Sequence, residues 1–224
     1  MIQVTIASQQ HRSHNIQKIV DALNEQTVKP DRIAIILQGY MINVYSQVEA
    51  VTYFKYENEG AIARFYHLCD DINLIIDDDF IPCKDYIKTA LDGLERNPTA
   101  FCSFWGFTTL PSKEYSFGWD IVPSWDCVPM DLRCIKVGCG LSIWDERKVK
   151  MRNMIQNHRN FNDMQVAIYC AKNNIPMYCL AHNENIAEHL GNEQSQSKAI
   201  WKTEANNAEL LQEFHTNLLT IFET

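Results

Sequence analysis

Residues 72–80 read INLIIDDDF, a mostly apolar run that ends in three consecutive carboxylates. The run from Ile72 to Ile76 is short and rich in β-branched residues, which is typical of a strand covered on both faces. In an open α/β sheet, ligands bind beyond the carboxyl ends of the strands. The stretch therefore predicts a buried strand that carries an acidic cluster, Asp77 to Asp79, to the ligand-binding edge of such a sheet.

The segments before this strand alternate between strand and helix patterns. β-branched and apolar residues dominate three predicted strands, which are Ile2–Ala7, Arg32–Leu37 and Val51–Tyr56. Two segments predict helices, Asn15–Glu25 and Ala61–Cys69, and the first has one apolar face formed by Ile16, Ile19, Val20 and Leu23. The order β-α-β-β-α-β favours an α/β fold whose mostly parallel central sheet is flanked by helices.

The second half of the chain has less regular patterns. It predicts helices at Lys84–Arg96 and Asn162–Asn173, the latter with an inner face formed by Met164, Ala167, Ile168 and Ala171. Residues Phe101–Asp131 are rich in aromatic residues, Gly and Pro without a clear period, so we expect strands joined by long loops. Pro176–Leu180 predicts a last strand, and apolar residues after Ser195 predict a closing amphipathic helix.

The composition is that of an ordinary globular protein. The chain has 224 residues, of which 46% are hydrophobic and 21% charged, and it shows neither repeats nor a linker. We expect one domain over residues 1–224, with 198–224 as a C-terminal helical extension. The formal net charge of −8 disfavours a nucleic-acid partner, because phosphate binding needs clustered cations. Since no apolar stretch approaches the ~18 residues that a bilayer requires, we expect a cytoplasmic protein without a transmembrane segment.

The cysteines indicate neither a disulfide framework nor a zinc site. The chain contains eight of them and no C-x-x-C pair. We expect them to be reduced and, for the most part, buried as small hydrophobic side chains.

The acidic triplet is the strongest chemical signal. Three adjacent carboxylates repel one another, and burial increases the cost, unless a cation or hydrogen-bond donors share the site. Carboxylate oxygens suit Mg²⁺ or Mn²⁺, which bind through one or two carboxylates together with substrate phosphates. The alternative is a solvated acidic turn, since charge runs are usually surface features.

The order of several further motifs resembles that of GT-A glycosyltransferases, a Rossmann-like class of nucleotide-sugar transferases, and in particular the large inverting family 2. In that family the triplet corresponds to the D-x-D signature. The other matching segments are VTIASQQHR, LNEQTVKPDRIAII, ENEGAIARF, FNDMQVAIYCAKNNIPM and EHLGNEQSQS, which begin at residues 4, 23, 57, 161 and 188. The resemblance runs from about residue 2 to residue 197, so it rests on the order of the motifs and not on a single one.

The resemblance implies a metal and diphosphate site. Asp77 or Asp78 would contact the ribose side of the nucleotide, and Asp79 would bind Mn²⁺ or Mg²⁺ between the two phosphates. His189, in the segment that matches H-[IL]-G, would be an additional ligand of the metal or the diphosphate, with His182 as the next candidate. For a histidine judged alone, a surface or capping role is as good an interpretation.

The resemblance also implies a general base. Asp163 would accept the proton of the acceptor hydroxyl as that oxygen attacks the anomeric carbon. Judged from the residues alone, Asp163 is equally suited to cap the helix that follows it, although Asn162 is able to cap it instead.

The nucleotide would lie against the turn after the first strand. In the resemblance, Ser8, Gln10 and Arg12 occupy the base-binding loop, and Gln38 stands where an aspartate usually contacts the base. An amide can pair with a uracil edge, so UDP is the expected nucleotide. Arg64 would face the nucleotide or form an ion pair with an aspartate of the triplet.

Glycines and tryptophans supply the candidates for the sugar side. The segment VGCGLSIW, residues 137–144, has two glycines where the backbone approaches a neighbour closely or adopts a positive φ. In the resemblance, Gly140 and Trp144 lie beside the donor sugar and the acceptor. A sugar platform would use one tryptophan of Trp105, Trp119 and Trp125, although large aromatic residues usually belong to cores.

Together these features predict a metal-dependent transferase. It would move a sugar from a UDP-sugar donor to a hydroxyl of a glycan, lipid-linked or protein-linked acceptor, with inversion. One alternative is a nucleotidyltransferase that makes nucleotide sugars, but such enzymes hold triphosphate with a Gly-rich loop, and ASQQHRSHN after the first strand has no glycine. The other alternative is a non-catalytic module that binds a sugar or a nucleotide.

Overall fold

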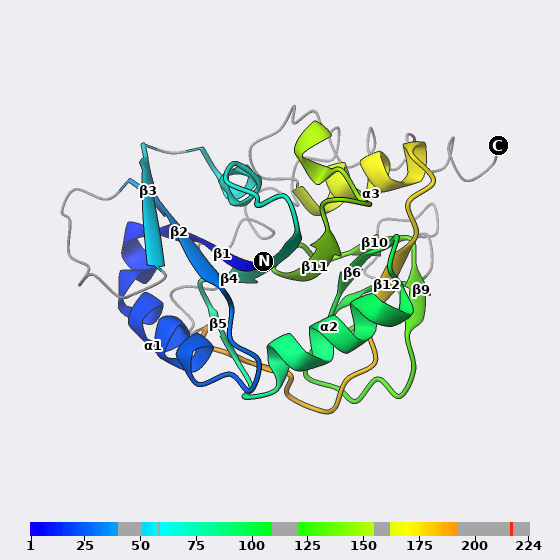
Figure 1. Ribbon diagram of the computed structural model, residues 1–224, viewed down its shortest axis with the longest axis horizontal. Helices are drawn as coiled ribbons and strands as arrows, with labels where there is room; N and C mark the ends of the chain where they lie inside the picture. The colour runs from blue at the N-terminus through cyan, green and yellow to red at the C-terminus, as the bar shows by residue number, and fades with distance from the viewer. Residues whose placement is uncertain (40–50, 58, 109–120, 155–161, 192–215, 217–224) are drawn as a thin grey trace.

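The computed structural model describes residues 1–39, 51–57, 59–108, 121–154, 162–191 and 216 (Figure 1). These residues form a single α/β domain around an eight-stranded mixed sheet with the strand order β3-β2-β1-β4-β11-β6-β12-β9. Trp119 and the helix predicted after Ser195 lie outside the described residues, apart from Thr216.

One half of the sheet is entirely parallel. It consists of β1 (Ile2–Gln9), β2 (Arg32–Gln38), β3 (Val51–Tyr56) and β4 (Ile72–Asp77). In β4, Leu74 and Ile76 pack into one core cluster, and Ile75 packs into the cluster on the other face. This burial on both faces explains the nearly continuous apolar run, and the parallel pairing makes β1, β2 and β4 end at one edge.

The other half of the sheet mixes directions. The strand β11 (Leu141–Asp145) runs antiparallel to both β4 and β6 (Phe101–Ser103), while β12 (Met177–Cys179) is parallel to β6 and antiparallel to β9 (Leu132–Cys134). Two small sheets complete the described strands: β10 (Lys136–Val137) with β7 (Gly106–Phe107) and β8 (Ile121–Val122), and β13 (Ala187–His189) with β5 (Phe80–Pro82).

Helices cover both faces of the sheet (Figure 1). On one face lie α1 (Ser13–Asn24) and α2 (Tyr86–Arg96). On the other lie α3 (Asn162–Lys172) and the short 3-10 helix η2 (Ala61–Phe65). Two further 3-10 turns are η1 (Gln10–Arg12) and η3 (Met151–Asn153). The predicted α/β fold with flanking helices is confirmed.

Two local predictions need correction. The segment Ala61–Cys69 is not an α-helix, because only Ala61–Phe65 forms a 3-10 helix, which follows Gly60 at a φ of 75°. In α3 the buried residues are Asn162, Gln165, Val166, Ala167 and Cys170, so Ala167 alone of the predicted inner face is buried. The helix is rotated because its polar first turn faces inward, where Asn162 donates to the carbonyl of Ala61 at 3.2 Å.

All eight cysteines are free thiols, and six of them are buried. In the part of the chain that the structure describes, no helix is both long and apolar enough to cross a membrane.

Candidate functional site

The acidic triplet lies where β4 ends. Asp77 is the last residue of β4, and Asp78 and Asp79 form the turn that leads into β5. The backbone N–H of Asp77 donates to the carbonyl of Gly140 at 2.8 Å, immediately before β11. Asp77 is therefore held between β1 and β11 in the central sheet. Because the Asp78 and Asp79 side chains are largely buried, the triplet is not a solvated surface turn.

Asp77 is paired with Arg64 from η2. The Arg64 Nη1 atom lies 2.6 Å from Asp77 Oδ1, and Arg64 Nε donates to the carbonyl of Ala61 at 2.8 Å. Burial, with the neighbouring charges of Asp79 and Asp78, raises the pKa of Asp77, while the charge of Arg64 opposes this shift. Of the two predicted roles for Arg64, the structure shows the ion pair with an aspartate of the triplet.

Arg12, from η1, contacts the other two carboxylates. Its Nη1 atom lies 2.8 Å from Asp78 Oδ1 and 2.9 Å from Asp79 Oδ2. Asp78 is buried and is also bound through its backbone, because Asn15 Nδ2 donates to the Asp78 carbonyl at 2.9 Å. The turn after β1 and the start of α1 thus lie directly against the triplet.

His189 reaches the triplet from the C-terminal part of the chain. The pairing of β13 with β5 sets His189 opposite Phe80, and Leu190 N donates to the Asp79 carbonyl at 2.6 Å. As a result, His189 Nε2 lies 3.6 Å from Asp79 Oδ2. Burial acts to raise the pKa of Asp79, but the hydrogen bond with His189 and the charge of Arg12 outweigh it and hold that pKa below its usual value.

These side chains fit a metal ion only in part. Among the described residues, no group of three or more His, Cys, Asp or Glu side chains is arranged to hold one. Asp79 and His189 supply one oxygen and one nitrogen donor just beyond the carboxyl end of β4, where ligands bind in such sheets. Mg²⁺ and similar hard cations commonly use one or two protein ligands and complete their shell with phosphate oxygens and water. The pair therefore fits a metal that a diphosphate helps to bind.

Asp163 lies in the first turn of α3, at the same edge. Its Oδ1 atom accepts the N–H of Cys139 at 2.9 Å, one residue before Gly140. Burial is the largest influence on the pKa of Asp77, which it raises, and on the pKa of Arg64, which it lowers; the charge of Asp163 is a smaller influence that raises both pKa values. Asp163 is therefore within electrostatic range of the triplet. Its carboxylate also accepts a hydrogen bond from the loop before β11, which contacts Asp77.

Two glycines allow close packing beside the triplet. A Cβ at Gly140 would lie 2.1 Å from Asp77 Oδ2, and a Cβ at Gly138 would lie 1.6 Å from the Trp105 indole. The predicted need for close backbone approach is confirmed at both positions. Trp105 is partly buried, and its indole lies against Gly138, two residues before Gly140.

The predicted nucleotide residues have different surroundings. Ser8 is fully buried at the end of β1, and Gln10 is exposed in η1. Gln38 is also buried, and its Oε1 atom accepts the backbone N–H of Glu59 at 3.0 Å. The carbonyl oxygen of the Gln38 amide is therefore used within the protein.

Trp144 does not belong to the site. Its side chain is fully buried in the core, 5.2 Å from the Phe101 ring and 5.9 Å from the Phe65 ring, and its Nε1–H donates to Glu146 at 2.7 Å. Because β11 alternates faces, Trp144 points into the core, where a sugar cannot contact it. The prediction that Trp144 contacts the sugar or acceptor is therefore wrong.

The two other candidates lie elsewhere. His182 is buried, and its Nδ1 pairs with the carbonyl of Leu180 at 2.6 Å. Trp125 is 60% exposed and lies outside the core. Neither makes a described contact with the triplet.

Sequence reasoning missed Asn15, which contacts Asp78, and Lys136, a buried cation within electrostatic range of Asp163. Lys136 is buried on β10, with its Nζ atom 3.9 Å from the centre of the Phe107 ring. Burial lowers the pKa of Lys136 to about 8, although the charge of Asp163 opposes the shift. The sequence carried a signal for each residue. Lys136 stands between Ile135 and Val137 in a short apolar run, and Asn15 stands next to Ile16 at the start of an apolar helix face.

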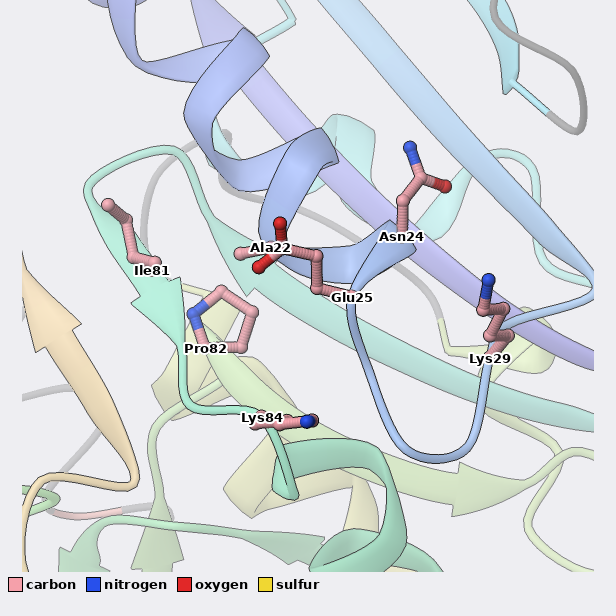
Figure 2. Close-up of a pocket in the computed structure, with 7 residues that line it drawn as sticks. All are labelled: Ala22, Asn24, Glu25, Lys29, Ile81, Pro82 and Lys84. Atoms are coloured by element: carbon pink, nitrogen blue, oxygen red, sulfur yellow. The ribbon is translucent and has the colours of Figure 1, made fainter.

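Figure 2 shows a separate pocket of about 480 Å³. It is lined by Ala22, Asn24, Glu25, Lys29, Ile81, Pro82 and Lys84. These residues come from the C-terminal end of α1 and the chain after it, and from β5 and the turn that follows. No residue predicted for the site lines this pocket.

No protein-family model matches the chain, and no curated protein matches it significantly.

Proposed function

We propose that the protein is a metal-dependent glycosyltransferase of the GT-A type. It would transfer a sugar from a nucleoside diphosphate, with UDP as the first candidate, to a hydroxyl group of a glycan, lipid-linked or protein-linked acceptor. The proposal combines the motif order with the geometry of the residues that those motifs contribute.

One observation carries the proposal. Side chains from five distant segments meet where the parallel strands end: Arg12, Arg64, Asp77–Asp79, Asp163 and His189. Four carboxylates and two guanidiniums at one edge of a sheet are not needed to stabilise a fold, since buried ion pairs contribute little net stability. Such a concentration of charge is typical of a functional site.

On the donor side, the protein supplies both acidic and basic groups. Arg12 and Arg64 offer planar donors that suit phosphate oxygens, and Asp79 with His189 would hold Mn²⁺ or Mg²⁺. When bound, the ion would offset the negative charge that develops on the departing diphosphate. Asp78 is bonded to η1 and α1 and keeps the turn after β1 beside the diphosphate position.

On the acceptor side, Asp163 takes the proton. The acceptor oxygen forms a bond to the anomeric carbon, while the bond from that carbon to the diphosphate oxygen breaks and its electron pair leaves with the UDP. The acceptor proton passes to the carboxylate of Asp163, whose position is held by the Cys139 N–H. Attack from the face opposite the diphosphate inverts the configuration.

The sugar would lie between these two groups. The indole of Trp105, fixed against Gly138, offers an apolar face for a pyranose ring close to Gly140. Gly140 has no side chain, so the Asp77 carboxylate can lie directly against its backbone at the edge of this space.

A donor screen followed by a turnover assay tests the proposal. Thermal unfolding is measured with UDP-, GDP- and dTDP-sugars, each with Mn²⁺ and with EDTA, and the donors that raise the midpoint are incubated to look for released nucleotide diphosphate. We expect a UDP-sugar to stabilise the protein only with Mn²⁺ and to be hydrolysed slowly. Binding without any turnover would favour the non-catalytic module, and pyrophosphate release from nucleoside triphosphate and sugar phosphate would favour the nucleotidyltransferase.

A further inference from the structure

We infer that Arg12 competes with the metal ion for Asp79, and that a nucleotide diphosphate removes this competition by binding the guanidinium. Metal and nucleotide would then bind cooperatively. The inference rests on the proposed function and specifies how its donor site is regulated.

The first argument is that Arg12 and a metal need the same oxygen. Asp79 Oδ2 lies 2.9 Å from Arg12 Nη1 and 3.6 Å from His189 Nε2. A metal bound by Asp79 and His189 would take the lone pairs of this oxygen that face His189. A guanidinium and a divalent cation on one carboxylate oxygen repel each other strongly at such short distances.

The second argument is that Arg12 bridges carboxylates as a cation would. A single nitrogen, Nη1, contacts Asp78 Oδ1 and Asp79 Oδ2, at 2.8 and 2.9 Å. The single positive charge of the bridge offsets part of the repulsion between these two adjacent carboxylates.

The third argument is that Arg12 is not fully satisfied where it lies. Its Nε atom is buried and has no hydrogen-bond partner among the described residues. By contrast, Nε of Arg64 donates to the carbonyl of Ala61, so Arg64 is anchored by its backbone contact as well as by Asp77. A buried donor without a partner is unfavourable. Arg12 therefore gains from a phosphate that offers it further acceptors, whereas Arg64 does not need to move.

These contacts predict reciprocal coupling. A diphosphate that binds the Arg12 guanidinium leaves Asp79 to the metal, and a metal on Asp79 leaves the guanidinium to the diphosphate. By linkage, each ligand then raises the affinity of the other by the same factor, which for such couplings is about 5- to 150-fold.

The test is calorimetric titration of the full chain with MnCl₂, with and without saturating UDP. The variants are Arg12→Gln and, as a control, Lys18→Gln, which removes an exposed positive charge from α1. In the wild type and the control, we expect UDP to strengthen Mn²⁺ binding by about tenfold or more. In Arg12→Gln, Mn²⁺ without UDP should bind about tenfold more tightly than in the wild type.

Two results would overturn the inference. The first leaves the proposed function standing, and the second contradicts its metal site as well. If Arg12→Gln binds Mn²⁺ alone no more tightly than the wild type, while UDP still promotes Mn²⁺ binding, Arg12 is no competitor and the proposed function stands. If none of the proteins binds Mn²⁺ even with UDP, the proposed metal site fails as well. Should Arg12→Gln not unfold cooperatively on heating, Arg12→Met replaces it, because this long side chain carries no charge; tighter Mn²⁺ binding than in the wild type is again expected.

Discussion

Gly140 and Asp77 are in such close contact that position 140 has no room for a side chain. The nearest atom to a Cβ there would be Asp77 Oδ2, at 2.1 Å, and the Gly140 carbonyl accepts the N–H of the same aspartate. The loop before β11 thus supports the carboxylate that pairs with Arg64, and substitutions in this loop act on the charged site directly.

Gly140→Ala should destabilise the protein by about 1–3 kcal/mol, because the methyl group displaces Asp77 from Arg64. Urea unfolding measures the change. The comparison is Gly93→Ala in α2, where a Cβ would press on the buried Leu180 side chain, at 2.6 Å, without touching a charged group. Equal stability of Gly140→Ala and the wild type would contradict the described contact.

Asp79→Asn should weaken Mn²⁺-dependent UDP binding by about tenfold or more, because an amide is a much poorer ligand for a hard cation. Titration calorimetry of UDP in the presence of Mn²⁺ measures the loss, and UDP with EDTA gives the metal-independent part. The matched control is Asp92→Asn, which removes an exposed carboxylate paired with Lys88 in α2. Unchanged affinity in Asp79→Asn would reject Asp79 as a metal ligand.

Asp163→Asn should lower kcat by a factor of about 10² or more while leaving UDP affinity almost unchanged. An asparagine oxygen can still accept the N–H of Cys139, so the loop keeps its support, but the amide cannot take a proton. Steady-state kinetics with the donor found in the screen gives kcat, and calorimetry gives the affinity. Equal losses in both quantities would indicate a structural role for Asp163.

Lys136→Met should stabilise the protein at neutral pH, and the gain should vanish in alkali. Burial lowers the pKa of Lys136 to about 8, below its usual value near 10.4, so the fold disfavours the charged amine. That cost is fully present below pH 8 and disappears as pH rises through 10.4, because the amine of the unfolded chain then becomes neutral as well. At pH 7 we expect this cost to lower the free energy of unfolding of the wild type, relative to Lys136→Met, by roughly 3 kcal/mol.

The measurement for Lys136 is urea unfolding of the wild type and Lys136→Met between pH 7 and pH 10. Comparing the two proteins at each pH cancels the titration of the cysteines and tyrosines, which is common to both. A difference in unfolding free energy that stays constant over this range would show that Lys136 does not titrate differently in the fold.

The periodicity of the chain predicted the parallel strands, β12 and the three α-helices, but not the central strand β11 or β13, which follows the strand predicted to be the last. All four parallel strands begin at the predicted residues. β3 also ends as predicted, and β1, β2 and β4 end one or two residues later. The helix α1 buries the predicted apolar face. These features are local: side-chain spacing decides which face of a strand or helix is buried. The placement of the triplet at the end of β4 follows from the same local pattern.

The tertiary structure alone decided which charged groups meet. Arg12 and Asp79 are 67 residues apart, and β13 lies opposite β5 although more than 100 residues separate Asp79 from His189. Strand order and register set such pairings, and no short pattern encodes them. The same reason explains the misplaced Trp144 and the rotated face of α3: their neighbours come from distant segments, and those neighbours determine which side chains are buried.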